Sequence, residues 1–300
     1  MPQSEWLGTF GELWGSLAPE QRQTITGLLP DGWAFDGRRI LDFGCGPGLT
    51  LREFRHEAAV AEFWGVDVDE ASVATLSATL VPPMHGATCG YSPPLPFDSS
   101  SFDLAWAISV FTHLTDNSIP WLLELHRILK PDGLLIATYM GAWMSEFVAA
   151  EPWDENRIGM NVLRHNHPWA DGGPIVLISE WWLREHWGRA FEVVRIAEPV
   201  HNFSWVLMRK RDVELTADDV ECPSDDPREF YAVRHNLHRA QREIEVAQDE
   251  FAAALHDANQ RCLELQRTYE RSLSWRATRP FRQTAQALRS WRARRSSSES

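Results

Sequence analysis

The sequence predicts an α/β fold with a mostly parallel sheet, followed by a C-terminal coiled-coil helix. Short apolar runs alternate with helical patterns from about residue 38 to residue 210. A glycine-rich turn follows the first apolar run, and from residue 230 onwards apolar residues recur alternately every three and four positions. Strands that alternate with helices are typical of a parallel sheet covered by helices on both faces.

Each element of the α/β region has its own signal. Apolar runs predict strands, and apolar residues at spacings of three and four predict helices. On this basis we expect strands at 38–44, 62–68, 102–110 and 133–140, and helices at 49–59, 70–80 and 119–129. Two further runs, 191–199 and 203–211, are separated only by three residues. This short connection predicts a hairpin, so one late strand runs antiparallel to its neighbours.

The C-terminal third has a different pattern. Residues 212–229 are acidic and contain prolines, which predicts a linker between a domain at 1–211 and a coiled coil at 230–273. The coiled-coil repeat has one four-residue stutter after Phe251, and several of its core positions are Ala. A single helix of this kind is only marginally stable in water. We therefore expect a homo-oligomer, as a parallel dimer or trimer, or a helix folded back on the acidic domain.

Charge is distributed unevenly. The net charge is −13, yet residues 271–300 hold eight Arg and one Glu. An acidic body argues against nucleic acid as the main partner. The basic tail at 274–300 is either a solvated end or a contact for an anionic membrane or an acidic assembly complex.

The cysteines and the apolar runs indicate the cellular compartment of the protein. Four scattered cysteines without a CxxC pair indicate a reducing compartment. No apolar run approaches the length of a membrane-spanning helix, and the first ten residues do not resemble a signal peptide. We expect a cytoplasmic protein, with the inner membrane face as an alternative place of attachment.

The stretch LDFGCGPGLT at 41–50 indicates a ligand site. A glycine-rich turn between the first strand and the first helix lies at the carboxyl edge of the sheet, where open α/β sheets bind ligands. The pattern is neither GxxxxGK[ST] nor GxGxxG, and Asp42 just before it would repel phosphate. Asp67, at the end of the second strand, can accept both hydroxyls of a ribose. The ligand is thus expected to have a ribose and a positive centre but no phosphate.

These motifs resemble a known family. LDFGCGPG followed by GVDVDE is similar to the class I S-adenosylmethionine-dependent methyltransferases, and LPFDSSSFDLAWAISVFTHL and LKPDGLLIATY resemble that family's fourth and fifth strand regions. The resemblance covers roughly residues 35–210. It implies a Rossmann-like sheet of seven strands with a late antiparallel hairpin, and S-adenosylmethionine as the cofactor.

The resemblance also implies a role for individual residues. Asp42 matches the acid that orients the loop and reaches the cofactor's amino group, usually through water. Asp67 matches the ribose ligand, and Val68 after it packs on adenine. Gly90 and Tyr91 lie where the family often has an acid for the adenine amino group, so backbone groups or the Tyr91 ring are expected to serve instead. The other matches are backbone positions: Gly44, Gly46 and Gly48 in the loop, and Ala107 and Ile108 at the methionine end.

The acceptor side is less specific. His113, just after the fourth strand, is the first candidate for a base, with capping within its own helix as the alternative; His167 is the second. His165, His167 and Asp171 could hold a metal, but no metal is expected. These three lie in a long insertion, 141–182, whose tryptophans either stack on sugar rings or pack in the core: Trp143, Trp153, Trp169, Trp181 and Trp182.

The tail gives the only indication of an acceptor class. YERSLSWRATRPFR resembles a segment that follows coiled coils in bacterial surface-polysaccharide glycosyltransferases and their companion methyltransferases. The expected reaction is therefore O-methylation of a small molecule, specifically a glycan or nucleotide-sugar hydroxyl. Two alternatives stay open, namely a non-sugar metabolite as acceptor and an inactive coiled-coil scaffold.

Overall fold

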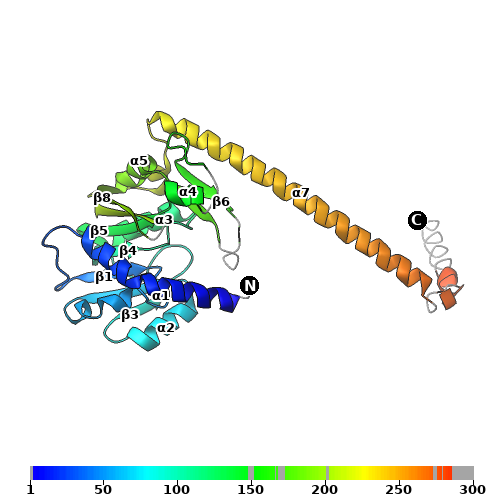
Figure 1. Cartoon of the computed structure of the whole chain (residues 1–300), viewed down its shortest axis with the longest axis horizontal. Helices are drawn as coiled ribbons and strands as arrows, with labels where there is room; N and C mark the ends of the chain where they lie inside the picture. The colour runs from blue at the N-terminus through cyan, green and yellow to red at the C-terminus, as the bar shows by residue number, and fades with distance from the viewer. Residues whose placement is uncertain are drawn as a thin grey trace, which may run out of the picture. The chain divides into compact units, whose positions relative to one another are not determined.

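The computed structural model describes residues 3–147, 152–165, 167, 173–200, 203–272, 276–278 and 280–285. The chain divides into two compact units, Met1–Asn236 and Leu237–Ser300. Figure 1 labels the elements of both units.

The first unit is built on one sheet of seven strands in the order β3-β2-β1-β4-β5-β9-β8. Six strands run in the same direction, whereas β9 runs antiparallel to its neighbours β5 and β8. The strands are β1 (Arg39–Phe43), β2 (Glu62–Asp67), β3 (His85–Thr88), β4 (Phe102–Ala107), β5 (Leu129–Tyr139), β8 (Phe191–Val200) and β9 (Phe203–Lys210). This confirms the predicted Rossmann-like sheet and its late hairpin.

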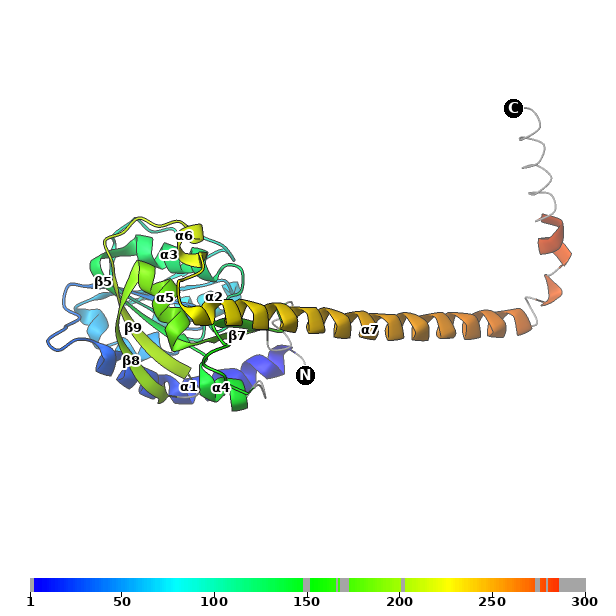
Figure 2. The same ribbon diagram turned by 90° about the horizontal axis from the view of Figure 1, so that it is seen from above.

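Helices cover both faces of the sheet (Figure 2). On one face, α1 (Gln3–Leu28) and α2 (Glu70–Leu80) bury apolar side chains against β1, β4 and β5. On the other face, α3 (Ser118–Ile128) and α5 (Glu180–Ala190) pack on the same strands, and α6 (Ala217–Glu221) contributes Val220 to this second layer. The sheet therefore lies between two apolar layers, and its carboxyl edge carries the loops that form the site.

The predicted helix at 49–59 is wrong in type. Two short 3₁₀ helices replace it, η1 (Leu51–Phe54) and η2 (Glu57–Ala59). Side chains three residues apart eclipse each other on a 3₁₀ helix, and Leu51 and Phe54 are both fully buried. The Phe54 ring stacks on Trp106 with a centroid distance of 5.0 Å. Tight packing against β4 thus favours the narrower helix.

The insertion at 141–182 is partly ordered. It contains α4 (Ala142–Phe147) and an antiparallel pair, β6 (Met160–Leu163) and β7 (Ile175–Ile178). A single parallel bridge between Met140 and Leu177 joins this pair to the end of β5. The insertion is therefore attached at the carboxyl edge of the main sheet.

Residues 212–229, expected as a linker, pack instead against α5. Thr216 and Asp219 form a capping box that begins α6, and Val220 is fully buried. Arg189 of α5 donates from Nη1 to the carbonyl oxygens of Asp219 (2.7 Å) and Cys222 (2.6 Å). The acidic residues of this segment therefore make specific contacts, and the compact unit extends to Asn236.

The long helix α7 (Pro227–Arg271) begins in the first unit and continues as the main element of the second. Its first turns are docked, because Ala232 is buried and Asn236 donates from Nδ2 to the carbonyl oxygen of Met160 at 2.8 Å. Among the described residues, no helix is both long and apolar enough to cross a membrane.

Candidate functional site

The glycine loop after β1 is held by β2. The backbone N–H groups of Gly44 and Cys45 both donate to the carbonyl oxygen of Val66, at 2.8 and 3.0 Å. Gly44 has a φ of +78°, and a Cβ there would lie 2.3 Å from a methyl group of Val110. Gly46 has a φ of +51°, and a Cβ there would meet no atom within 4 Å. Only glycine suits the first position, and the second leaves open space above the loop.

Asp67 at the end of β2 is tied to this loop. Its Oδ2 accepts a hydrogen bond from the backbone N–H of Gly46 at 2.8 Å, and its Oδ1 accepts one from Asp69 at 2.9 Å. A carboxylate offers about four acceptor positions, so two stay available for donors outside the protein. The side chain is half-buried, which leaves it accessible from the open side of the loop. The arrangement suits a ligand that brings two hydroxyl groups.

Asp42 lies beneath the loop and is almost fully buried. Within the described chain its Oδ2 has no hydrogen-bond partner. Burial raises the pKa of Asp42 to about 7; the Trp106 indole beside it opposes this rise, and the negative charge of Asp67 adds to it. A buried carboxylate without a partner is unfavourable. A cationic ligand group near Oδ2 would compensate for this cost.

The residues expected around the adenine border the same edge. Val68 is 39% exposed and Tyr91 is 75% exposed, so both side chains are accessible. The Tyr91 carbonyl is fixed by two α3 groups, because it accepts from Asn117 Nδ2 (3.2 Å) and Trp121 Nε1 (3.3 Å). A Cβ on Gly90 would come within 3.5 Å of the Ser92 carbonyl oxygen. These contacts fix the local backbone at Gly90 and Tyr91.

Ala107 and Ile108 are buried in the core, so only their backbone can serve a ligand. The next residue, Ser109, has a φ of +59°, and its N–H donates to the Thr138 hydroxyl of β5 at 2.7 Å. The sequence analysis missed both Ser109 and Thr138. No local signal predicts a left-handed serine, since its conformation is set by a residue 29 positions away.

His113 lies on the loop after β4, beside the insertion. Its Nδ1 lies 2.8 Å from the carbonyl oxygen of Pro174, and the N–H of Val176 donates to the carbonyl oxygen of Thr112 at 2.9 Å. A carbonyl only accepts, so Nδ1 carries the proton and Nε2 of the neutral ring is the acceptor nitrogen. Burial lowers the pKa of His113, and the bond to Pro174 opposes that shift. The ring is thus neutral at pH 7 with a defined tautomer.

The other histidine candidates lie in the β6–β7 connection. His165 Nε2 is 3.0 Å from Asp116 Oδ1, and Asp116 belongs to the same loop as His113. His167 is half-buried, and its backbone N–H donates to Arg164. No contact described by the structure joins His167 to His113. Of the other residues named for this region, Trp169 and Asp171 lie outside the described residues.

Three insertion tryptophans separate into two environments. Trp181 and Trp182 are core residues, with 5% and 8% of their surface exposed, and Trp181 donates from Nε1 to the carbonyl oxygen of Ile158 at 3.0 Å. Trp143 on α4 is 42% exposed. Of these three, only Trp143 is accessible enough to stack on a bound ring.

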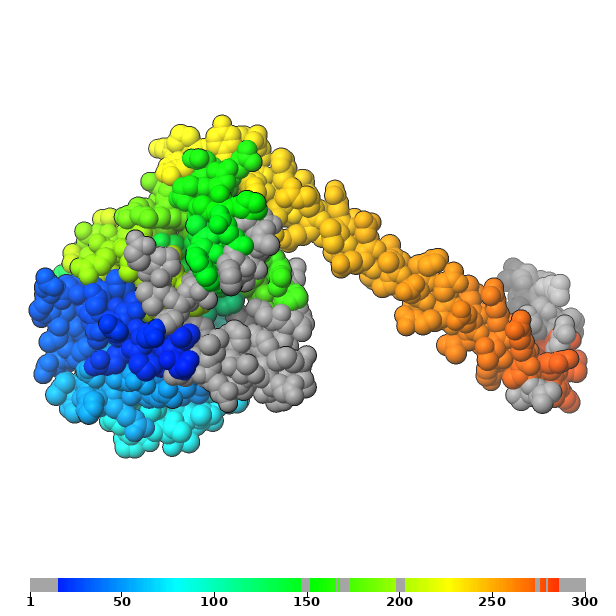
Figure 3. Space-filling model, in the orientation of Figure 1, coloured from blue at the N-terminus to red at the C-terminus, as the bar shows by residue number. Residues whose placement is uncertain are grey.

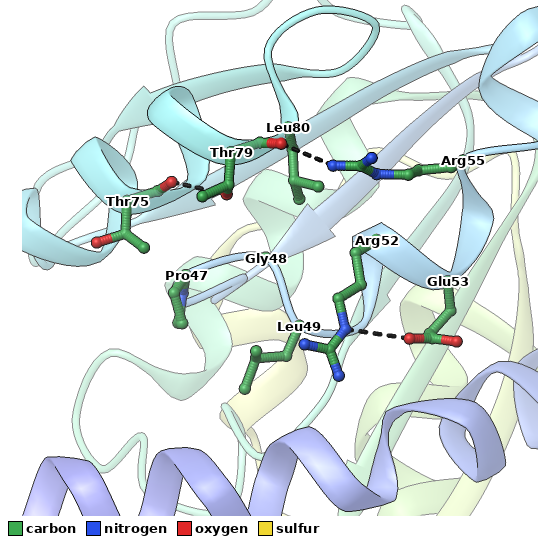
Figure 4. A pocket seen from close by; sticks show the side chains of 9 residues that line it. All are labelled: Pro47, Gly48, Leu49, Arg52, Glu53, Arg55, Thr75, Thr79 and Leu80. Atoms are coloured by element: carbon green, nitrogen blue, oxygen red, sulfur yellow. Dashed lines mark hydrogen bonds and ion pairs between the residues drawn. The ribbon is translucent and has the colours of Figure 1, made fainter.

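A separate pocket of about 440 Å³ lies between the glycine loop, η1 and α2 (Figure 4). Arg55 donates from Nη2 to the carbonyl oxygen of Thr79 at 2.7 Å, and Arg52 is paired with Glu53. Asp42, Gly46 and Asp67 do not line this pocket. The hydrogen-bonding groups that fit the expected cofactor therefore lie elsewhere, on the loop and at the end of β2.

With this geometry in place, comparison with known proteins is informative. Residues 41–137 match the family model of a methyltransferase domain. This match supports S-adenosylmethionine as the cofactor of the domain.

The proteins that are similar to this region have names that describe different activities. A malonyl-[acyl-carrier protein] O-methyltransferase of Erwinia billingiae is 33% identical over 124 residues, covering 39% of this chain and 46% of that protein. A ubiquinone biosynthesis O-methyltransferase of Maricaulis maris is 30% identical over 122 residues, with the same coverage of 39% and 46%. A human mitochondrial arginine-hydroxylase is 32% identical over 102 residues, covering 34% and 28%. The chain thus spans less than half the length of these relatives.

Among solved structures, an S-adenosylmethionine-dependent methyltransferase from Mesorhizobium loti is similar to this chain. It has a TM-score of 0.47 and 19% identity, and the alignment covers 63% of this chain and 96% of that one.

The residues of the loop fit S-adenosylmethionine. This molecule carries a ribose, a sulfonium and an amino group, and it has no phosphate. Asp67 presents acceptors for the ribose hydroxyls, and Asp42 Oδ2 is a buried acceptor that lacks a partner among the described residues and suits the amino group. The open face at Gly46 leaves room for backbone contact. Residues Asp42, Gly46 and Asp67 would therefore hold the cofactor.

Proposed function

We propose that this chain transfers a methyl group from S-adenosylmethionine to a hydroxyl group of a small molecule, of the glycan or nucleotide-sugar class. The observation that carries the proposal is the position of the Asp67 carboxylate, which is hydrogen-bonded to the open glycine loop at Gly46. The methyltransferase domain match and the two O-methyltransferase relatives support the reaction type.

When bound, S-adenosylmethionine supplies an electrophilic methyl group on a positively charged sulfur. The protein then has to align the acceptor oxygen and receive its proton. We assign Nε2 of His113 as the atom that receives this proton, because the Pro174 carbonyl fixes the other ring nitrogen as the donor. His167 and His165 are the second choice for this role, since they lie in the connection next to the same loop.

The glycan class of acceptor depends on the resemblance of the C-terminal tail. Among the insertion tryptophans that the structure describes, Trp143 at the start of the insertion is the most exposed, so we assign it to stacking on a sugar ring. A non-sugar metabolite would need the same base and the same cofactor loop. The arginine-hydroxylase relative makes a different reaction on a related domain the principal alternative to methyl transfer.

The proposal is tested by incubating the full-length protein with methyl-labelled S-adenosylmethionine and a panel of acceptors. The panel should contain nucleotide-sugars, cell-envelope glycans, carboxylic acids, phenols and an arginine-containing peptide. We expect label in a glycan or nucleotide-sugar, in a linkage that resists mild base, as an ether does. Label only in a carboxylic acid or phenol would retain methyl transfer but contradict the acceptor class. Hydroxylated peptide without label transfer would contradict the reaction itself.

A further inference from the structure

The part of α7 beyond Asn236 exposes an apolar stripe. Apolar residues at alternate spacings of three and four are at least half exposed, among them Ile244 (57%), Phe251 (70%), Leu255 (52%), Leu265 (71%) and Tyr269 (63%). The helix is continuous through Arg271, and Figure 3 draws the side chains of this part of α7 in orange. One helix with a narrow apolar stripe is marginally stable in water, and within the described part of the chain Ile244, Phe251, Leu255 and Leu265 stay more than half exposed.

We propose that this stripe is covered by a second copy of the same helix in antiparallel orientation, with the two-fold axis between Ala254 and Leu255. This replaces the parallel arrangement expected from the sequence. Three independent features of the helix favour it, namely the position of the stutter, the sizes of the facing side chains and the charges beside them.

The stutter lies at the centre of the proposed pair. In an antiparallel pair about this axis, each core residue faces the one at equal distance on the other side of position 254/255. Phe251 then faces Ala258 of the second copy, and Ile244 faces Leu265. The break in the heptad repeat falls between Phe251 and Leu255, so it coincides with the axis and both copies change phase at the same level.

The aromatic core residues meet small partners. Phe251 faces Ala258 and Tyr269 faces Ala240, whereas Ile244 faces Leu265 and the two copies of Leu255 meet at the axis. In a parallel, in-register pair the same residues would face their own copies. Phe251 would then meet Phe251 while Ala258 met Ala258, and the two helices could not keep one separation along their length. Close packing favours the arrangement that alternates large and small.

The charged residues beside the stripe also favour the antiparallel pair. The helical neighbours of Glu250 at three and four residues are all apolar: Val246, Ala247, Ala253 and Ala254. No ion pair within the described chain involves Glu250. In the antiparallel pair Asn259 of the second copy is directly opposite Glu250, and Arg261, two residues further along on the same side of the stripe, is within reach of the Glu250 carboxylate; the symmetry produces this contact twice. A parallel pair would place Glu243 beside Gln248 and Arg261 beside Gln266, which gives no attraction between opposite charges.

The basic tails also favour the antiparallel pair. Residues 271–300 hold eight Arg and one Glu, a local charge of +7. In a parallel pair two such tails would begin side by side and repel each other. In the antiparallel pair they begin at opposite ends of a segment of roughly 50 Å, given 1.5 Å per residue. This separation is several times the screening length of about 8 Å at physiological salt.

Cys262 provides a direct test in the full-length protein. It faces Ala247 of the second copy in the antiparallel pair, but faces its own copy in a parallel one. Cys222, which is also exposed, is first replaced by Ser. Under mild oxidation this background should give no covalent dimer, whereas adding Ala247→Cys should give one through a disulfide between positions 247 and 262. Adding Cys262→Ser to that variant should abolish the cross-link.

A charge swap gives a second, independent measurement. Glu250→Arg should weaken the dimer at least fivefold in sedimentation equilibrium, because each of two exposed pairs worth up to about 1 kcal/mol becomes repulsive. Combining Glu250→Arg with Arg261→Glu should restore the dimer. Arg242→Glu is the matched control, because Arg242 is exposed on the side of the helix away from the stripe, and it should leave the dimer within about twofold.

Three results would overturn the proposal. A wild-type protein with the monomer mass by light scattering would remove the pairing. A covalent dimer through Cys262 alone, or through Ala247→Cys in the absence of Cys262, would show a parallel pair instead. Absence of rescue by the double charge swap would contradict the register.

Discussion

At the scale of single residues, the site depends on two carboxylates in different environments. Asp67 is half-buried and satisfied by backbone N–H groups, whereas Asp42 is buried with one oxygen lacking a partner among the described residues. The first already accepts two hydrogen bonds from the backbone in the protein without ligand. A charged Asp42 costs free energy in the protein without ligand, because it is buried. A cationic ligand group that pairs with it would offset this cost.

Replacing Asp42 should therefore stabilise the protein without ligand. The folded-state pKa of Asp42 is raised from 3.8 to about 7, so the folded protein holds a proton that the unfolded chain has lost between these values. Stability thus falls as the pH rises from about 4 to 7 and stays low above it. At pH 8 we expect the free energy of unfolding of Asp42→Asn, measured in urea, to exceed that of wild type by on the order of 2–4 kcal/mol. The gain should shrink towards pH 4; a variant less stable than wild type at pH 8 would contradict this.

His113 should act in turnover but not in cofactor binding. If Nε2 takes the acceptor proton, His113→Ala should lower kcat by about 10²–10⁴ and leave S-adenosylmethionine affinity unchanged. Because burial lowers the pKa of His113, the wild-type rate should rise with pH through a value below 6.5 and be level above it. His167→Ala is the matched control. A loss below threefold in His113→Ala, with a large loss in the control, would move the base to the insertion.

At the scale of elements, the insertion and the start of α7 complete the first unit. His186 of α5 is buried between the Val220 carbonyl oxygen (2.8 Å from Nδ1) and Glu229 Oε2 of α7 (2.9 Å from Nε2). The Arg228 guanidinium lies 4.9 Å from the ring centre of Trp181. A Cβ on Gly159 would lie 2.8 Å from the Trp182 ring, so this packing requires glycine there.

Breaking the buried pair should destabilise the first unit. Glu229→Ala leaves His186 without its acid partner in a site that excludes water, so we expect a loss of about 3 kcal/mol in urea unfolding. Glu243→Ala removes the exposed partner of an ion pair with Arg239 on the same helix and should cost less than about 1 kcal/mol. Equal effects of the two substitutions would show that the His186 contact adds no particular stability.

Truncation at two positions tests where the first unit ends. A chain that stops after Asn236 keeps α6 and the docked turns of α7, so it should retain cofactor binding and the thermal midpoint of the full chain. A chain that stops after Arg211 loses the cover of α5, and its midpoint should drop by about 10 °C. Equal midpoints would mean that residues 212–236 only lie on the surface.

At the scale of the whole molecule, the sequence predicted what depends on local patterns. The alternation of runs identified the central strands, and the structure joins Gly46 and Asp67, two residues that the sequence indicated for the candidate site, by a hydrogen bond. The sequence did not predict the features that depend on contacts between distant residues. These are the 3₁₀ helix η1 packed on Trp106, the strands of the insertion and the packing of 212–229 on α5. Ser109 could not be found for the same reason, since Thr138 holds it from another strand.

The central claim is that the loop from Asp42 to Gly48 and Asp67 form a site for S-adenosylmethionine. The most direct test is calorimetric titration of this cofactor into wild type, Asp67→Ala and Asp67→Asn at pH 8. Charged hydrogen bonds contribute about 1.5–3 kcal/mol each, so the wild type should bind one equivalent and Asp67→Ala at least tenfold more weakly. Asp67→Asn, which keeps the shape and loses the charge, should lie between them. A folded wild type that binds no cofactor, or an Asp67→Ala variant with wild-type affinity, would contradict the account.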